Sequence, residues 1–467
     1  MFNEDIDGTM AHDIMLCEQG IMEEATLQKI LGALQEIKEG WNKGELSIGA
    51  EYEDIHEFIE TRVIEKIGIE AGGAMHTGRS RNDQVMVDMK MVSKKEILAI
   101  AEDLLGLIKT MCDLADKHVE TPMVYYTHGQ PAMIGTFGHY LLSYVDAFMR
   151  DYTRIKQCYD RFNSNPLGAT AIGGTNFRIS RLRTSELLGF DYIQENSVDA
   201  VSSRDWAMEI TSVLSILMAN VSRMAADFVM WAGAEFQYIK VADEYSSSSS
   251  IMPQKHNPST VELIRGKSAE VFGTLQETMT MVKGLPTGYY QDLQQTKIAL
   301  WRAFDTTRTS LEVLNGVIST LTVNGDMMMK QVKGSFIFAV QLAETLAEDP
   351  ALSFREAYKI TAAVVANLIS EGKTLDDLQA ADVQNVAKEL FNKDIKVSSS
   401  IAQKVADPMK ALNNLRSPGS PHPAEISMAV ENRMELRERY WKELDFLKIK
   451  LVIAADNLKN AIAQHQS

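Results

Sequence analysis

The sequence has few of the residues that break helices or cross-link chains. Its 467 residues include 11 prolines and 3 cysteines. Cys17, Cys112 and Cys158 form no CxxC or His-Cys pattern, which argues against both a disulfide framework and a zinc site. An odd, small number of thiols is typical of buried cysteines in a reducing compartment.

Basic charge is also scarce, because 47 Lys and Arg face 63 Asp and Glu, giving a net charge of −16. Binding to phosphate backbones or anionic membranes needs clustered Lys and Arg, so neither a nucleic-acid nor a membrane partner is expected. The acidic start, MFNEDIDGTM, is unlike a signal peptide. The longest apolar stretch, residues 208–231, is interrupted by Asn220, Arg223 and Asp227, so no membrane span is expected. We therefore predict a cytoplasmic protein.

Long segments without Gly or Pro carry apolar residues at three- and four-residue spacing, which indicates amphipathic helices. At ~1.5 Å per residue, helices of this kind are long rods that pack side by side in a bundle. No alternating strands with hairpin turns and no GxGxxG motif are evident. We therefore predict an all-α fold with a central bundle of long helices. The expected helices cover residues 97–115, 208–231, 261–282, 298–321 and 426–463.

A serine-rich segment runs into one of these helices, as SSSSSIMPQKHNPSTVELIRGK at residues 246–267. Asn257 and Pro258 suit the N-cap and first turn of a helix. Free backbone N–H groups at such a helix start attract negative charge, and Lys255 adds to that attraction. The alternative is a flexible linker with a capping Asn257 and a solvated Lys255.

Two further polar segments lie between helical runs. The first is HTGRSRNDQ at residues 76–84, where Arg79 and Arg81 supply the forked donors that hold carboxylates. The second is YYTHGQ at residues 125–130, where His128 is a candidate acid or base beside Thr127. Each alone could be an ordinary polar loop. Together they converge only if helix ends meet or if subunits share a site.

At these residues the sequence resembles the argininosuccinate lyases of the fumarase and aspartase superfamily. The superfamily pattern SSxMPxKxNP is present at residues 249–258, and HTGRSRNDQ narrows the resemblance to the argininosuccinate lyases. The similarity runs from about residue 4 to about residue 425. It includes EDIH at 53–56, ELLGFD at 186–191, ENSVDAVSSRD at 195–205 and GLPTGYYQDLQ at 284–294.

The resemblance implies a subunit of three helical domains, at residues 1–78, 79–325 and 326–467, the last with an extra terminal helix. It also implies a homotetramer with a twenty-helix core, in which three subunits build each active site. The expected reaction is the reversible cleavage of argininosuccinate to arginine and fumarate, the last step of arginine synthesis, with no metal or organic cofactor.

By the same resemblance, Ser249 is the base, and Lys255 and Asn257 bind the carboxylate where negative charge develops. His128 pairs with Glu262, and its role as proton donor or as polarising group stays open. Another serine of residues 246–250 is an alternative base. A neutral serine is a poor base, so the helix start and Lys255 must lower its pKa or a mobile loop must enclose it. The implied substrate contacts are Ser80, Arg81, Asn82, Thr127, Tyr289, Gln294, Lys297 and His56.

Two other functions stay open. One is a related lyase of the adenylosuccinate lyase, fumarase or aspartase type, against which HTGRSRNDQ and the Tyr289, Gln294 and Lys297 group argue. The other is an inactive structural protein, like the lens crystallins of this family.

The chain departs from the family pattern at several places. Family members usually begin with further residues that carry a WGGRF-like stretch, and full activity is expected to depend on such contacts. Ser248 replaces a usual Gly, and Met133 and Ile134 stand where Gln and Pro are usual. The terminal helix, residues 428–463, is expected to pack on the C-terminal domain or on another subunit.

Overall fold

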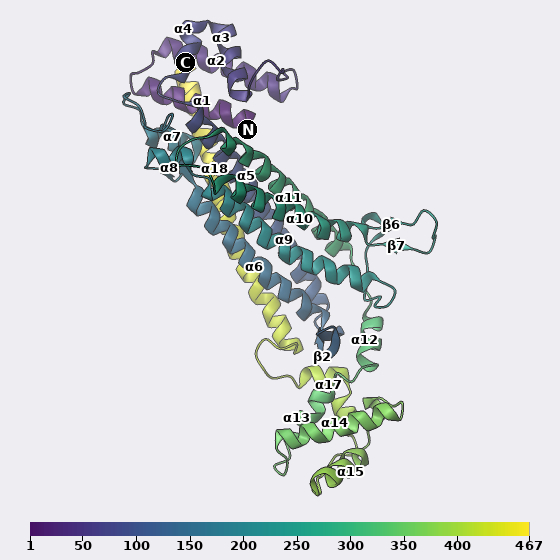
Figure 1. The fold of residues 1–467 in the computed structure, drawn as a ribbon. Helices are drawn as coiled ribbons and strands as arrows, with labels where there is room; N and C mark the ends of the chain where they lie inside the picture. Colours follow the sequence, from purple (N-terminus) through teal and green to yellow (C-terminus); the bar gives the residue numbers. More distant parts are fainter. Residues whose placement is uncertain (467) are drawn as a thin grey trace.

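The computed structural model describes residues 1–466 and confirms the all-α prediction, since helices form most of the chain (Figure 1). The molecule is elongated, with a helical N-terminal domain at one end, long helices in the middle and a small helical domain at the other end. Three separate hydrophobic clusters correspond to these parts.

The N-terminal domain is a group of short helices around buried aliphatic side chains such as Leu27, Ile30 and Leu34. Asp54 starts one helix by accepting a hydrogen bond from the Glu57 backbone N–H at 2.9 Å. The elements are α1 (Phe2–Glu18), α2 (Glu24–Asn42), α3 (Ile55–Ile67), α4 (Ile69–Gly72) and η1 (Gly73–His76).

Five long helices form the central bundle. Four of them correspond to the predicted segments 97–115, 208–231, 261–282 and 298–321, whereas the helix over residues 137–162 was not among the predicted ones. Ser80 starts the longest of them through a capping box with Asp83. The side chain of Thr136 caps the second by accepting from the His139 backbone N–H at 3.1 Å. The bundle helices are α5 (Arg81–Lys117), α6 (Phe137–Phe162), α9 (Asp205–Ala232), α10 (Ser259–Val282) and α11 (Thr296–Thr320), with α7 (Arg181–Leu188) and α8 (Ser197–Ser202) between α6 and α9.

The helix α9 lies in the core of this bundle, in contact with α6, α10 and α11. Within residues 1–466 it is the one helix long and apolar enough to cross a membrane, with a mean hydropathy of 1.4. Its Leu214, Leu217, Val221 and Phe228 are fully buried. This burial is typical of the central helix of a bundle, and we assign α9 to the core.

No strands joined by hairpin turns were predicted from the sequence, and this prediction was wrong for residues 122–136. There β1 (Pro122–Thr127) pairs antiparallel with β2 (Gln130–Thr136). His128 and Gly129 form the two-residue turn with φ of 55° and 72°, the left-handed conformation that such turns need. A His at the first turn position is not the usual Asn or Asp, so the hairpin was hidden. The other strands have two residues each: β3 (Ser164–Asn165), β4 (Tyr192–Ile193), β5 (Ile239–Lys240), β6 (Ser247–Ser248), β7 (His256–Asn257) and β8 (Thr322–Val323).

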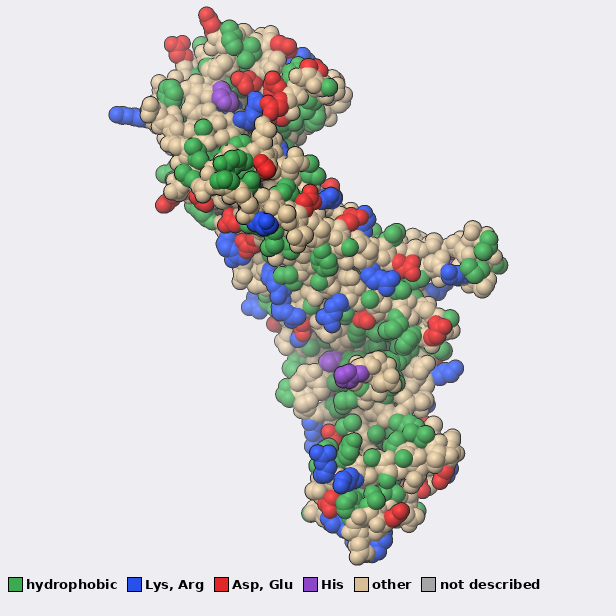
Figure 2. Space-filling view, viewed as in Figure 1, with side chains coloured by type: hydrophobic (Ala, Val, Ile, Leu, Met, Phe, Trp, Pro, Cys, Tyr) green, Lys and Arg blue, Asp and Glu red, His purple; other side chains and the backbone are tan. Residues whose placement is uncertain are grey.

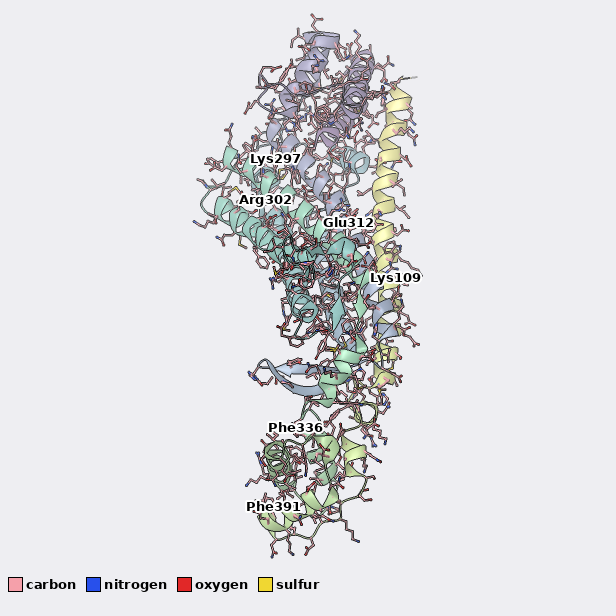
Figure 3. All side chains as sticks on the ribbon, turned by 90° about the vertical axis from the view of Figure 1, so that its right-hand side faces the viewer. Lys109, Lys297, Arg302, Glu312, Phe336 and Phe391 are labelled. Carbon is pink, nitrogen blue, oxygen red and sulfur yellow. The ribbon has the colours of Figure 1, made fainter. Side chains whose placement is uncertain are left out.

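The C-terminal domain is a small helical unit that packs against the β1–β2 hairpin. Val124 and Ile134 of the hairpin share its hydrophobic cluster, and Phe336 and Phe391 lie within this end of the molecule (Figure 3). Its helices are α12 (Gly325–Lys333), α13 (Ala339–Ala347), α14 (Phe354–Ser370), α15 (Ala380–Phe391), α16 (Ile401–Val405) and α17 (Pro408–Asn413).

The terminal helix α18 (Pro423–Gln466) leaves the C-terminal domain and runs back along the bundle to the N-terminal domain (Figure 1). It packs on α5, α6 and α7 of the same chain and then on α1 and α2. The expectation that it packs on the C-terminal domain was therefore wrong, and packing of its outer face on another subunit stays a prediction. Its buried face explains the path, because Leu444 joins the core of the bundle and Leu458 joins the N-terminal core.

The close contact with α7 depends on one glycine. Gly189 ends α7 in the left-handed conformation, with φ of 70°. A Cβ atom there would lie 2.9 Å from Cβ of Ala454 in α18, which is closer than side chains approach. Ion pairs reinforce the path at Lys448 with Glu102, at 2.8 Å, and at Arg433 with Asp146, at 2.9 Å.

The buried face of α18 generates a stability prediction. Leu444→Ala removes a side chain that is 2% exposed, and a cavity of this kind costs about 2–4 kcal/mol. We expect a clearly lower Tm in thermal unfolding followed by circular dichroism. Phe446→Ala, at a neighbouring position that is 62% exposed, is the control and should leave Tm nearly unchanged. Equal Tm values for the two variants would contradict the packing of α18.

Candidate active site

The three polar segments lie in three separate parts of the folded molecule. Residues 80–82 start α5 beside the N-terminal domain, Thr127 and His128 lie on the β1–β2 hairpin at the other end of the bundle, and residues 247–257 form the projecting β6–β7 hairpin (Figure 1). The 37 residues of α5 keep the first two segments about 55 Å apart. A single chain therefore does not bring the predicted site residues together.

The start of α5 holds the first group in a fixed geometry. Ser80 Oγ caps the helix by accepting from the Asn82 backbone N–H at 3.3 Å, while the Asn82 side chain donates to the Ala171 carbonyl at 2.9 Å. The Arg81 guanidinium lies 3.5 Å from Asp54 and 3.7 Å from Glu53. These side chains are partly exposed and are the forked and amide donors that a carboxylate needs.

Asp83 ties this helix start to a neighbouring loop, and the sequence did not single it out. One carboxylate oxygen accepts from the Ser80 backbone N–H at 3.0 Å. The other accepts from the backbone N–H groups of Gly168 at 2.9 Å and Thr170 at 2.7 Å. Burial raises the pKa of Asp83 even though these donors lower it. The signal in the sequence was its position three residues after Ser80, the spacing of a capping box.

Tyr289, Gln294 and Lys297 lie at the same end of the bundle, and Figure 3 shows Lys297 at the end next to the N-terminal domain. Gln294 donates to the Tyr289 hydroxyl at 3.0 Å. Burial lowers the pKa of Lys297, while Asp54 and Asp88 raise it. Since Asp54 also faces Arg81, the structure brings Ser80, Arg81, Asn82, Tyr289, Gln294 and Lys297 to one end of the bundle.

Arg204 lies beneath this group and was not predicted as a site residue. It is 1% exposed, and its Nη1 donates to the carbonyls of Val201 at 3.2 Å and Ser203 at 2.8 Å. Burial lowers its pKa to about 10, with an opposing contribution from Tyr289. The guanidinium thus adds buried positive charge under Tyr289. Arg204 belongs to the family motif ENSVDAVSSRD at residues 195–205, but the motif does not reveal that this arginine is buried.

His56 lies in a buried polar cluster between the N-terminal helices and α5. Its Nδ1 is 3.0 Å from Asp5 and 3.7 Å from Asp88, and Gln84 also donates to Asp5, at 2.5 Å. Burial alone would raise the pKa of Asp5, but His56, together with Arg79 and Gln84, outweighs burial and holds the pKa at about 2. Burial raises the pKa of Asp88, and the Asp5 charge raises it further. Because His56 is only 3% exposed, this structure argues against direct substrate contact.

The β1–β2 hairpin presents Thr127 and His128 to solvent at its tip. A cavity of about 850 Å³ lies beside it, lined by Thr127 and Met133 of the hairpin and by aromatic side chains of α6 and α9. Ile134, by contrast, points into the C-terminal core. The two residues that depart from the family pattern therefore have different surroundings. Met133 lines the cavity, whereas Ile134 packs in the C-terminal core.

The β6–β7 hairpin projects from the bundle and carries Ser249, and hydrophobic side chains gather at its tip (Figure 2). Ser249 Oγ accepts from the backbone N–H groups of Ile251 at 3.4 Å and Met252 at 3.1 Å. Its own N–H donates to the Lys255 carbonyl at 3.3 Å. Two backbone donors aimed at one hydroxyl oxygen favour the alkoxide form of that serine.

Lys255 directly precedes β7, Asn257 lies on β7, and Glu262 lies in the first turn of α10. Lys255 and Glu262 are exposed, and neither makes an ion pair within residues 1–466. His128 and Glu262 make no contact with each other in the part of the chain that the structure describes. Their predicted pairing needs a second subunit and stays a prediction.

Two family models match most of the chain. Residues 1–273 match the family described as "Lyase" and residues 336–406 match "Argininosuccinate lyase C-terminal". The chain is 37% identical over 466 residues to the argininosuccinate lyase of Methanosarcina mazei, covering 100% of this chain and 94% of that protein. It is 42% identical over 426 residues to the argininosuccinate lyase of Geobacillus thermodenitrificans, covering 91% of each.

Solved structures show the same fold. EDDS lyase in complex with formate superimposes with a TM-score of 0.91 at 27% identity, covering 100% of this chain and 92% of that chain. A fumarate lyase from Mesorhizobium sp. BNC1 superimposes with a TM-score of 0.73 at 16% identity, covering 92% and 95%. The second likeness concerns the fold alone.

The three hydrogen bonds of Asp83 generate a prediction. Asp83→Asn leaves one acceptor oxygen in place of two, so a buried N–H group loses its partner, which costs about 1–3 kcal/mol. We expect a lower Tm and faster proteolysis at residues 168–174, measured by limited digestion. Asp116→Asn, at an exposed position of the same helix, is the matched control. The link to the loop would be refuted if both variants resisted the protease equally.

Proposed function

The chain belongs to the argininosuccinate lyases of the fumarase and aspartase superfamily, and on this premise we propose that it cleaves argininosuccinate reversibly to arginine and fumarate. The observation that carries the proposal is the presence of all three polar groups of the family pattern, at the start of α5, at the tip of the β1–β2 hairpin and on the β6–β7 hairpin. We further propose the domain division 1–78, 79–325 and 326–467, with α18 extending from the third domain onto the other two.

We propose a homotetramer with a twenty-helix core, in which three subunits supply each active site. The separation of the three groups within one chain supports this assembly. Large apolar side chains also remain exposed along α10 and α11, at Leu263, Phe272, Met279 and Ile298. Large apolar side chains that stay exposed on long bundle helices are a feature of surfaces that another subunit covers.

In the proposed reaction, Ser249 removes the proton from the carbon next to a substrate carboxylate. The resulting aci-carboxylate carries two negative charges, and Lys255 and Asn257 stabilise it. Collapse of this intermediate expels the guanidinium nitrogen from the neighbouring carbon and leaves fumarate. The backbone N–H groups of Ile251 and Met252, 3.4 Å and 3.1 Å from Ser249 Oγ, support the alkoxide that the base requires.

The other residues take roles in binding. Arg81, Asn82 and Lys297, with Ser80, Tyr289 and Gln294, hold the substrate at the start of α5, and Thr127 and His128 reach the same substrate from a second subunit. Glu262 orients His128 across the subunit boundary. The reaction as written needs no metal or organic cofactor.

We place the protein in the cytoplasm. The cysteines of residues 1–466 are free thiols, and Cys112 and Cys158 are buried. Such thiols are typical of a reducing compartment.

A second candidate function is a carbon–nitrogen lyase that acts on a different fumarate–amine adduct. The similarity to EDDS lyase, with a TM-score of 0.91, supports it, and so does Met133, an apolar side chain that lines the cavity beside His128. Fumarate release measured with argininosuccinate and with N-succinyl diamines in parallel separates the two functions.

The assignment of Ser249 as the base predicts different effects for substitutions at Ser249 and Ser250. Ser249→Ala should lower kcat with argininosuccinate by about 10²–10⁴-fold, as measured by fumarate absorbance. The neighbouring Ser250→Ala should retain activity because its hydroxyl lacks the two backbone donors. The reverse ranking would transfer the base to Ser250, and full activity in both variants would remove the base from these two serines.

The shared site generates the second prediction. Ser249→Ala and His128→Asn tetramers, each inactive, are mixed after mild denaturation and allowed to reassemble. Random mixing should restore roughly a quarter of the sites, because each site takes the two residues from different subunits. Each variant reassembled alone is the control. Inactivity of the mixed tetramers would contradict the shared site.

A further inference from the structure

The end of α18 meets the junction of α1 and α2 at three potential metal ligands. Cys17 lies in the last turn of α1, Glu24 is the first residue of α2, and His465 lies in the last turn of α18. Cys17 Sγ is 3.2 Å from Glu24 Oε2, and His465 Nδ1 is 2.8 Å from Glu24 Oε1. The three ligand atoms all lie within 4.8 Å of one another.

We propose that Cys17, Glu24 and His465 form a binding site for a divalent cation of the zinc class. A thiolate, a carboxylate and an imidazole are the ligand types that Zn²⁺ takes, and three protein ligands leave a fourth position for water. The sequence argued against a zinc site because the three cysteines form no CxxC or His-Cys pattern. The fold overturns that argument by bringing the two ends of the chain together.

The charges of the site balance when a cation binds. In the structure one oxygen of the Glu24 carboxylate accepts a hydrogen bond from the Cys17 thiol, and the other oxygen faces the His465 ring. On binding, the thiol proton passes to solvent and the sulfur lone pair forms the bond to the metal, while His465 binds through neutral Nδ1. A dipositive ion with one thiolate and one carboxylate is then neutral. No electron transfer and no further reactant are needed.

The site is accessible from solvent without unfolding. Glu24 is exposed, and Cys17 and His465 are partly exposed. Cys112 and Cys158, in contrast, are each 0% exposed in the bundle core. Cys17 is therefore the thiol that a soluble metal or an alkylating reagent reaches first.

The position of the site suggests a structural role. Leu458 and Ile462 of α18 already pack in the N-terminal core, and Gln466 donates to Gln35 of α2 at 2.6 Å. A metal bond between residues 17 and 465 would close a loop of almost the whole chain, and cross-links of long loops reduce the entropy of the unfolded state most. The cation would thus hold the terminal helix on the N-terminal domain, apart from the chemistry of the active site.

The test uses the full chain after treatment with a chelator, titrated with Zn²⁺ by calorimetry and with Co²⁺ by absorption spectroscopy. We expect one strongly bound equivalent per chain, a thiolate-to-cobalt charge-transfer band, and at least about tenfold slower alkylation of Cys17 by iodoacetamide. Tm should rise by a few degrees at saturating Zn²⁺.

Matched variants decide whether these three side chains are the ligands. Cys17→Ser and His465→Gln should each weaken Zn²⁺ binding by at least about tenfold, and Cys17→Ser should abolish the charge-transfer band. His465→Cys should restore binding, because it keeps three ligands. Glu23→Gln, next to the site and exposed, is the control and should bind as the parent chain does. Undiminished binding in Cys17→Ser and His465→Gln, or unchanged alkylation of Cys17 at saturating Zn²⁺, would overturn the proposal.

Discussion

The length and stiffness of the central helices constrain everything else in this molecule. Because α5 runs without interruption from Arg81 to Lys117, the donors at its start and the hairpin beyond its end cannot approach each other. Packing against α6, α11 and α18 prevents the helix from bending enough to change this. Chemistry that needs both groups must therefore take place between chains, and the exposed apolar side chains of α10 and α11 offer contacts through which chains can associate.

The same helix connects the candidate site to the N-terminal domain through buried charge. Asp5, His56 and Asp88 form a buried group below the start of α5, and Arg79 donates to Thr9 of α1 at 2.7 Å. Removing one partner from such a group leaves an uncompensated charge, which costs more than the pair itself contributes. The position of Ser80, Arg81 and Asn82 therefore depends on how α1 and α3 sit on α5, so that residues far from the substrate determine the geometry of the site.

The sequence allowed the helices and the site motifs to be predicted, but not the contacts between distant segments. Periodicity located four of the five bundle helices, all but α6, because each buries a continuous apolar stripe, as Leu214, Leu217 and Val221 do in α9. The β1–β2 hairpin was missed because its turn places His128 in a left-handed conformation. Histidine is not a residue from which such a turn is usually predicted. Arg204, Asp83 and the Cys17–His465 approach were missed for a related reason, since each depends on segments that only the folded chain brings together. The path of α18 was misjudged because an amphipathic stripe shows that a helix is covered but not what covers it.

The net charge of the molecule opposes the binding of the proposed substrate. The chain carries a net charge of −16, whereas the substrate is an anion. The positive groups at the start of α5 are partly neutralised in the structure, since Arg81 faces Asp54 and Glu53 and Asp54 also acts on Lys297. These pairs are long, at 3.5 Å and 3.7 Å for Arg81, and their side chains are partly exposed, so each stabilises the empty site only slightly. A substrate carboxylate with shorter, bidentate contacts can replace Asp54 and Glu53 at little cost. The acidic surface then excludes anions that cannot make such contacts, and the local donors select those that can.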